Sequence, residues 1–431
     1  MKDFFKRMLG LGLAKDALIA PHGMILTLGE DRKGVLHGTT RSANVLVSGG
    51  TSRERIEKII IPTLLRGSTA SYVVDDPTGE IFAVTAAARS RLGPVSRIQW
   101  GAGRWEAHCR YNPLAEGNLG DNPDTRSRRL RAIAEAIVTE PAELHETHSP
   151  EDGQSADAEI QNQATSVLWG LLELACQQVQ SSSGLPLAEP TLHALANLLL
   201  RAPLAGSVAD YVRTAEASDS GRALFELRAF ADLPEERQTV VAHLVTSRML
   251  AFRSEKIAWV TGEERSRWEV QDRFVPAEAV VSDGPATVYV SCPKQYGEDH
   301  AGPNILTQIL WRHIIDEALQ VEDRRDKHPR RDEIFLFTDC EQISPIPGLG
   351  QLAAQAGAAG LSVLVSCDDA SALDRLYGPS EAQALKATIS LEIDCAQNSS
   401  QYVRRGPDRP VLRPLNGMSS FLLPAPKGHW P

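Results

Sequence analysis

The fold of this chain is decided by residues 44–56, which read Asn-Val-Leu-Val-Ser-Gly-Gly-Thr-Ser-Arg-Glu-Arg-Ile. The first part is a short, mostly apolar run of the kind that forms a buried strand. Gly49 and Gly50 follow it, and an apolar helical stretch begins near Ile56. A strand, a glycine turn and a helix in this order form the frame in which many α/β proteins hold phosphate groups.

The frame lacks the chemistry that phosphate binding requires. A nucleotide-binding loop of this type needs Gly-Lys-Ser/Thr, because the backbone N–H groups and the lysine bind phosphate while the hydroxyl binds Mg²⁺. No Gly-Lys dipeptide occurs anywhere in the chain. Taken alone, a glycine pair between a strand and a helix is most often an ordinary turn.

Further motifs accompany the loop in a fixed order. They are Gly23–Gly29 before it and, after it, Ile59–Leu65 (IIIPTLL), Tyr72–Glu80 (YVVDDPTGE), Arg89–Gly93 (RSRLG), Tyr111–Leu114 (YNPL), Leu336–Glu341 (LFTDCE) and Leu361–Gly378. In this order they resemble the TraG/TraD family of coupling proteins, the DNA-transfer ATPases of type IV secretion and conjugation. The resemblance covers nearly the whole chain and implies an α/β, RecA-like P-loop NTPase core with a mostly parallel sheet and an inserted all-α domain.

Alignment through Pro62 shows what has changed in the loop. Arg55 stands where the resembled family has its lysine, and Glu54 where it has the preceding glycine. A carboxylate at Glu54 would face phosphate oxygens, and like charges a few ångströms apart repel strongly in a poorly solvated site. The planar guanidinium of arginine does not replace the compact ammonium of lysine.

The positions that the family uses for hydrolysis have changed as well. Asp339 keeps the Mg²⁺-associated carboxylate, but Cys340 replaces the glutamate that polarises water, and Asp368 replaces the first glutamine of a later motif. The resemblance therefore implies a degenerate nucleotide pocket made of Gly49, Gly50, Thr51, Glu54, Arg55, Asp339, Cys340 and Asp368. These changes predict a pseudo-ATPase with no catalytic residue, metal or cofactor. Only the alternative, an active but divergent translocation motor for DNA or protein, would use ATP and Mg²⁺.

Sequence patterns typical of β-strands end near residue 120 and resume near residue 280. Short β-rich runs alternate with helical stretches in residues 24–114, as in a parallel α/β sheet. From about residue 127 to residue 260 the apolar residues instead repeat at helical spacing. We therefore predict a discontinuous core at 1–120 and 280–431 and a mainly helical insertion at 121–279.

The net charge bears on nucleic-acid binding, and the cysteines bear on the compartment in which the chain works. The net charge of −10 disfavours a free-standing nucleic-acid binder, whose footprint would be basic. The best nucleic-acid candidate is a loop that carries Arg324, Arg325, Lys327, Arg330 and Arg331, although aspartates interrupt it and no aromatic residue lies within it to stack bases. The six cysteines have no metal-ligand spacing and fit free thiols in a reducing compartment.

The chain has no run of about 18 apolar residues that could span a bilayer. We therefore predict a cytoplasmic protein. Residues 2–15 form a basic amphipathic stretch, which either attaches peripherally to the inner membrane or, more commonly for such stretches, packs on protein.

Three functional classes remain open from the sequence. The first is a pseudo-ATPase that binds substrates or partners in a type IV secretion or conjugation system, with an active coupling-protein paralogue as one candidate partner. The second is the divergent motor, with Glu57 or Glu341 supplying a base. The third is an unrelated enzyme with Cys340 or Cys367 as its nucleophile, which would need a nearby histidine.

Overall fold

The computed structural model describes the chain in separate stretches. These are residues 27–30, 36–39, 43–66, 70–100, 109–139, 154–177, 185, 187, 189–217, 221–262, 272–276, 285–292, 301–320, 333–395, 401–404 and 412–414. The chain divides into two compact units, of which the first contains residues 1–98, 276–294 and 311–431 and the second residues 99–275 and 295–310. The bounds of the second unit differ from those of the expected insertion at 121–279.

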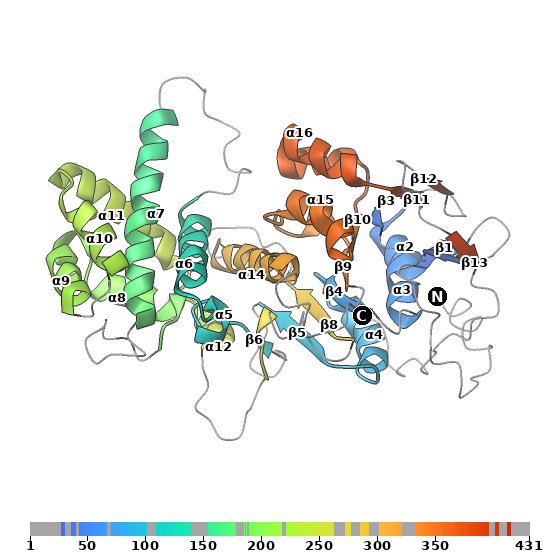
Figure 1. The fold of residues 1–431 in the computed structure, drawn as a ribbon, viewed down its shortest axis with the longest axis horizontal. Coiled ribbons are helices and arrows are strands. Elements are labelled where there is room, and N and C mark those ends of the chain that lie inside the picture. Colours follow the sequence, from blue (N-terminus) through green and yellow to red (C-terminus); the bar gives the residue numbers. More distant parts are fainter. Residues whose placement is uncertain are drawn as a thin grey trace. The chain divides into compact units, whose positions relative to one another are not determined.

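The first unit is built on a mostly parallel sheet (Figure 1). In spatial order its strands are β12 (Gln401–Arg404), β11 (Leu391–Asp394), β3 (Asn44–Ser48), β10 (Leu361–Ser366), β9 (Glu333–Phe337), β4 (Ser71–Asp75), β8 (Thr287–Ser291) and β5 (Val95–Gln99). Strand β3 pairs in parallel with β10 and β11, and β4 pairs in parallel with β8 and β9. Within this sheet, among the pairs whose register is described, β12 alone runs antiparallel to its neighbour, which is β11.

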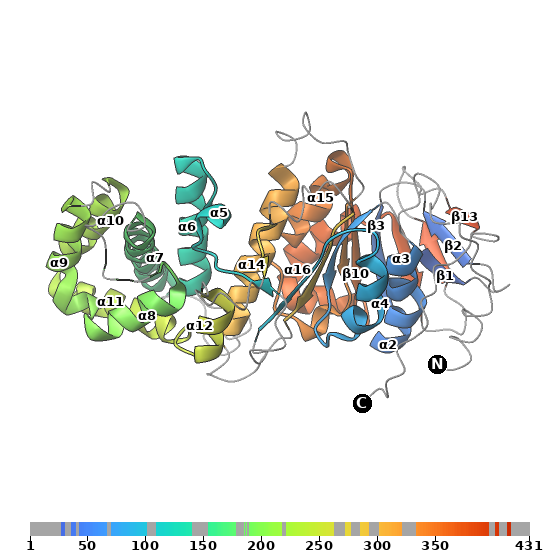
Figure 2. The ribbon, with the colours of Figure 1, turned by 90° about the horizontal axis from the view of Figure 1, so that it is seen from below.

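Helices cover both faces of this sheet. On one face lie α2 (Ser52–Arg55), the π-helical η1 (Ile56–Ile60), α3 (Ile61–Arg66) and α4 (Glu80–Arg89) (Figure 2). Val45, Val47 and Val74 from the strands pack there against Ile59 and Leu64. The other face is covered by α15 (Leu349–Ala359), with α16 (Ser371–Thr388) packed on it.

The helix after the loop changes its hydrogen-bond register. Pro62 has no N–H, and its ring would clash with the carbonyl of Lys58 four residues earlier. The turn before it widens instead, so that the N–H of Ile61 donates to Ile56, five residues back. The widened turn still leaves Ile59 and Ile60 fully buried in the core.

The second unit is mainly helical. It contains α5 (Glu116–Leu119), α6 (Pro123–Val138), α7 (Gln154–Gln177), α8 (Leu192–Arg201), α9 (Leu204–Ala217), α10 (Gly221–Ala231), α11 (Glu235–Leu250), α12 (Glu255–Thr261) and the short strands β6 (Cys109–Arg110) and β7 (Asp272–Arg273). The long helix α7 packs against α6, α10 and α11. Helix α7 begins at Gln154, and no glycine or proline occurs in it before Gly170.

Three elements complete the described chain. Helix α14 (Ala301–Leu319) runs from residues of the second unit into residues of the first, where the Trp311 ring lies 5.2 Å from that of Phe337. A separate antiparallel sheet joins β1 (Thr27–Glu30), β2 (Leu36–Thr39) and β13 (Leu412–Pro414). Among the described helices, none alone is long and apolar enough to cross a membrane, although α8 and α9 together meet that requirement as a pair bent by 115°.

Candidate functional site: a phosphate-type loop closed by its own side chains

The loop after β3 follows from its two glycines. Gly49 and Gly50 have φ of 74° and 65°, a region in which residues with a Cβ are strained. A Cβ on Gly50 would stand 2.9 Å from the carbonyl oxygen of Cys395, just after β11. The loop therefore lies at the carboxyl ends of parallel strands, the edge at which open α/β sheets bind ligands.

Glu54 takes part in capping the amino end of its own helix, α2. Its carboxylate accepts hydrogen bonds from the backbone N–H of Thr51 at 2.9 Å and from the Thr51 hydroxyl at 3.2 Å. The Thr51 hydroxyl in turn accepts from the N–H of Glu54, which completes a capping box. The hydrogen bond from the Thr51 backbone N–H, followed by the hydrogen bond and positive charge of Lys58, lowers the pKa of Glu54. The carboxylate thus takes a position at which a helix amino end can hold phosphate.

Arg55 is fully buried and bonded on every side of its guanidinium. Its Nε donates to the Ser366 hydroxyl at 2.9 Å, and one terminal nitrogen donates to the carbonyl oxygens of Gly49 and Gly50 at 3.4 and 3.2 Å. The other terminal nitrogen lies 2.8 Å from Oδ1 of Asp368. Arg55 therefore ties the loop to the end of β10.

Four backbone N–H groups of the loop are engaged as well. The N–H of Gly49 donates to the carbonyl oxygen of Asp368 at 3.0 Å, and that of Arg55 donates to the carbonyl oxygen of Thr51. Together with those of Thr51 and Glu54, four loop N–H groups have partners within the protein. A phosphate would need such groups unoccupied, and in this conformation these four already have partners within the protein.

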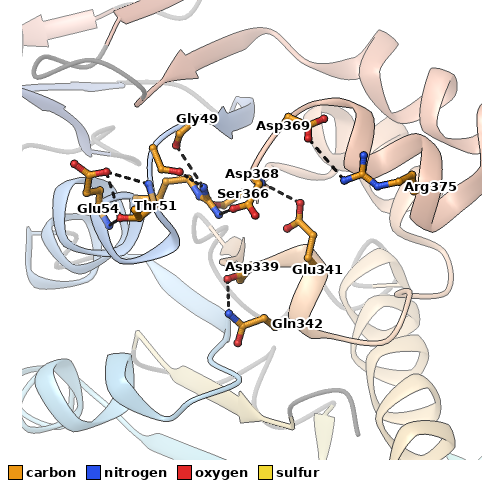
Figure 3. A network of polar contacts seen from close by, with 12 residues as sticks. Gly49, Thr51, Glu54, Asp339, Glu341, Gln342, Ser366, Asp368, Asp369 and Arg375 are labelled. Carbon is orange, nitrogen blue, oxygen red and sulfur yellow. Dashed lines mark hydrogen bonds and ion pairs between the residues drawn. The ribbon is translucent and has the colours of Figure 1, made fainter. Parts of the chain in front are cut away.

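Acidic groups lie below the loop, at the carboxyl ends of β9 and β4. Glu341, from the 3₁₀ turn η5 (Cys340–Gln342), accepts from the N–H of Asp368 at 3.0 Å, and Asp339 accepts from the Gln342 amide at 2.8 Å (Figure 3). Burial and a hydrogen bond with Asp339 raise the pKa of Glu341. Burial, Asp76 and Asp339 hold the pKa of Asp75 well above its usual range.

The two cysteines beside the site are poor nucleophiles. Both Cys340 and Cys367 are buried. Burial raises the pKa of Cys340 well above its usual range and that of Cys367 to about 12. Since the thiolate is the reactive form, this environment disfavours a catalytic cysteine at either position.

All eight residues of the expected pocket lie in the described part, and two loop residues, Gly49 and Arg55, bond directly to Asp368. Ser366 and Glu341 join them as hydrogen-bond partners. Ser366 gave no sequence signal, because it belongs to a strand more than 300 residues away. The Thr51–Glu54 capping box was readable, since a threonine followed three residues later by glutamate is its sequence pattern. The basic loop of Arg324, Arg325, Lys327, Arg330 and Arg331 and the amphipathic stretch 2–15 lie outside the described residues.

The described residues contain no group of three or more His, Cys, Asp or Glu side chains arranged to hold a metal ion. Of the carboxylates below the loop, Glu341 accepts a hydrogen bond from the N–H of Asp368 and Asp339 accepts one from the Gln342 amide.

Comparison with known proteins agrees with this geometry. The family model for type IV secretory system conjugative DNA transfer matches residues 9–272, more than half of the chain. The chain therefore belongs to the conjugative DNA transfer family of type IV secretory systems, the family to which the sequence resemblance pointed. No curated protein matches the chain.

Solved structures confirm the fold. The unbound monoclinic form of the bacterial conjugative coupling protein TrwBdeltaN70 is 15% identical, with a TM-score of 0.52 over 83% of this chain and 69% of that one. The complex of the plasmid coupling protein TrwB with ADP and Mg²⁺ is 14% identical, with a TM-score of 0.51 over 81% of this chain and 70% of that one. The prediction of an α/β, RecA-like P-loop NTPase core is thereby confirmed.

Proposed function

We propose that this chain is a pseudo-ATPase of its family, a coupling-protein-like component that binds substrates or partners in a type IV secretion or conjugation system without hydrolysing ATP. The observation that carries the proposal is the position of Arg55. Its buried guanidinium binds the carbonyl oxygens of Gly49 and Gly50, so these peptide groups present acceptors rather than donors to the centre of the loop. A phosphate group has only acceptors to offer in return.

The Glu54 carboxylate supports the same proposal. It is an anion held by the loop's own N–H and hydroxyl groups. A nucleotide phosphate would have to displace it and Arg55 together. The chain therefore needs no ATP or Mg²⁺ to keep this loop ordered, and we propose that it has no resident cofactor.

The proposed role places the chain among the proteins of the secretion or conjugation machine. A partner of the same family that hydrolyses ATP would supply the energy for transport. We propose a cytoplasmic location, with stretch 2–15 as the candidate peripheral contact to the inner membrane. Contact with DNA rests only on the basic loop 324–331 and is the weaker part of the proposal.

The alternative is an active, divergent motor, and one arrangement favours it. Asp339 and Glu341 lie together at the end of β9, and the raised pKa of Glu341 is a property of many general bases. For this role Arg55 would have to release the two carbonyl oxygens, and Glu54 would have to leave the loop.

Calorimetry with ATP and Mg²⁺ tests the proposal. We expect no binding by the natural chain and measurable binding by the double variant Glu54→Gly/Arg55→Lys, because this change frees the N–H of Thr51 and restores a compact cation. Arg53→Ala is the matched control, since Arg53 has an exposed side chain that pairs with Glu57 outside the loop. Micromolar, Mg²⁺-dependent binding by the natural chain would overturn the pseudo-ATPase and make hydrolysis the next assay.

A further inference from the structure

The helix that follows the loop is continuous from Ser52 to Arg66 but contains one widened turn. Its three parts are α2, the π-helical η1 and α3. The N–H of Ile61 donates to the carbonyl oxygen of Ile56, five residues back, whereas an N–H in an α-helix donates four residues back. The widened turn therefore holds one residue more than an α-helical turn. Such π turns are rare, and they occur frequently at functional sites.

The part of this helix after the π turn is fixed by apolar packing. Ile59, Ile60 and Leu64 belong to the hydrophobic core on this face of the sheet. Ile59 and Ile60 are fully buried, and Leu64 is 1% exposed. A change of helical register that moved this part would take apolar area out of the core, which is costly.

The part before the π turn is held only by polar groups. Helix α2 reads Ser-Arg-Glu-Arg, and Arg55 is its buried residue, bonded to the loop carbonyl groups and to side chains at the end of β10. Two ion pairs cross the turn on its solvent side, Arg53 with Glu57 and Lys58 with Glu54, and such pairs are weak restraints. Helix α2 can therefore turn about its axis without removing an apolar side chain from the core.

Pro62 selects the widened register. It has no N–H to donate to Lys58, and its ring would clash with the Lys58 carbonyl group in an α-helix. In the α register the extra residue would join the regular helix, so α2 would be turned by about 100° and shifted by about 1.5 Å along the axis. A rotation of this size would take the Arg55 guanidinium away from the Ser366 hydroxyl and from the loop carbonyl oxygens.

We propose that the turn Ile56–Ile60 is a two-register switch for the loop after β3. In the π register Arg55 closes the loop, and in the α register α2 turns away and the loop opens. Pro62 is a positioning residue, because it acts on the loop only through the register of the helix. This inference adds a means of regulation to the site of the proposed function and rests on the closed loop described there.

A double-mutant cycle in urea denaturation tests the switch. Arg55→Ala should lower the unfolding midpoint of the natural chain. In the Pro62→Ala chain the same change should lower the midpoint by less than half as much, because alanine permits the α register, in which Arg55 has already left its partners. Pro379→Ala, at an exposed proline within α16, is the matched control and should leave the effect of Arg55→Ala unchanged.

Deletion of Glu57 in the Pro62→Ala chain is the rescue variant. Glu57 belongs to the π turn, and without it an α-helical turn spans the same height while α2 keeps its present orientation. The full effect of Arg55→Ala should then return. Hydrogen exchange reads the loop directly, since the N–H groups of Gly49 and Thr51 should exchange faster in the Pro62→Ala chain and slow again after the deletion.

Equal effects of Arg55→Ala in the natural and Pro62→Ala chains would overturn the inference. So would a deletion that restores neither the effect of Arg55→Ala nor the slow exchange, since Pro62 would then act on stability alone. Circular dichroism confirms that each variant is folded. No nucleotide is present in these measurements, so binding of ATP in calorimetry would overturn the pseudo-ATPase alone and leave this result standing.

Discussion

Replacement of Arg55 by alanine tests whether the closed loop is a structural element. In the folded chain the guanidinium makes hydrogen bonds to Ser366, Gly49, Gly50 and Asp368. The alanine variant removes all of them and leaves a cavity where a fully buried side chain had been. The carbonyl oxygens of Gly49 and Gly50 would lose the hydrogen bonds that Arg55 donates to them, and alanine could not replace these bonds.

The magnitude follows from these contacts. Each hydrogen bond to a neutral acceptor contributes about 1 kcal/mol net, so the bonds to Ser366, Gly49 and Gly50 account for roughly 3 kcal/mol. The ion pair adds little, on the order of 0.5 kcal/mol, because the Asp368 side chain is 66% exposed and screened by water. The cavity adds a further cost, whereas relief from burying a charge offsets part of the total. We expect Arg55→Ala to lower the free energy of unfolding by about 2–4 kcal/mol.

Urea denaturation followed by circular dichroism measures this change as a lower midpoint, on the order of 1 M for a protein of this kind. Arg53→Ala is the control, because its side chain is 60% exposed and water screens its pair with Glu57. A midpoint for Arg55→Ala equal to that of Arg53→Ala would refute the reasoning, since the buried guanidinium would then contribute nothing to stability.

Three further predictions follow from single sites. Gly50→Ala should destabilise the chain by about 1–3 kcal/mol in thermal unfolding, because φ is +65° and the new Cβ would meet the Cys395 carbonyl. Gly357→Ala should instead be neutral or stabilising by up to about 1 kcal/mol, since a Cβ in that helix meets nothing within 4 Å; equal effects at both glycines would contradict this account. Glu333 is buried with its pKa raised from 4.5 to about 8, so the unfolded chain ionises first and stability is lost as pH rises from 4.5 to 8. Glu333→Gln should therefore gain stability over the natural chain at pH 8 but not near pH 4, and a gain of the same size at both pH values would exclude ionisation as the cause. Asp76→Ala should cost roughly 1–3 kcal/mol in urea denaturation, because Asp76 accepts from two N–H groups in the first turn of α4; an unchanged midpoint would show that this cap is dispensable.

Local patterns were enough to locate most elements of the core. The apolar runs at Val45–Ser48, Ser71–Asp75 and Ile334–Phe337 coincide with the strands at 44–48, 71–75 and 333–337. Such runs are informative because strands buried on both faces need apolar residues at every position. The register change at Ile56–Ile60 was not predicted, although Pro62 was its signal.

Residue identities along the chain were enough to show that the loop frame is present and that Glu54, Arg55 and Cys340 replace the residues that nucleotide chemistry requires, because identity at a recognisable position is a local property. They could not decide what the replacements do. Glu54 was expected to repel phosphate, but its partner is the Thr51 N–H of its own helix. The partners of Arg55 on β10 are brought to it only by the parallel pairing of β3 with β10, a contact between segments more than 300 residues apart. The tertiary structure was needed to show that Arg55 and Asp368 bond to each other, because this contact depends on strand order and register rather than on spacing along the chain.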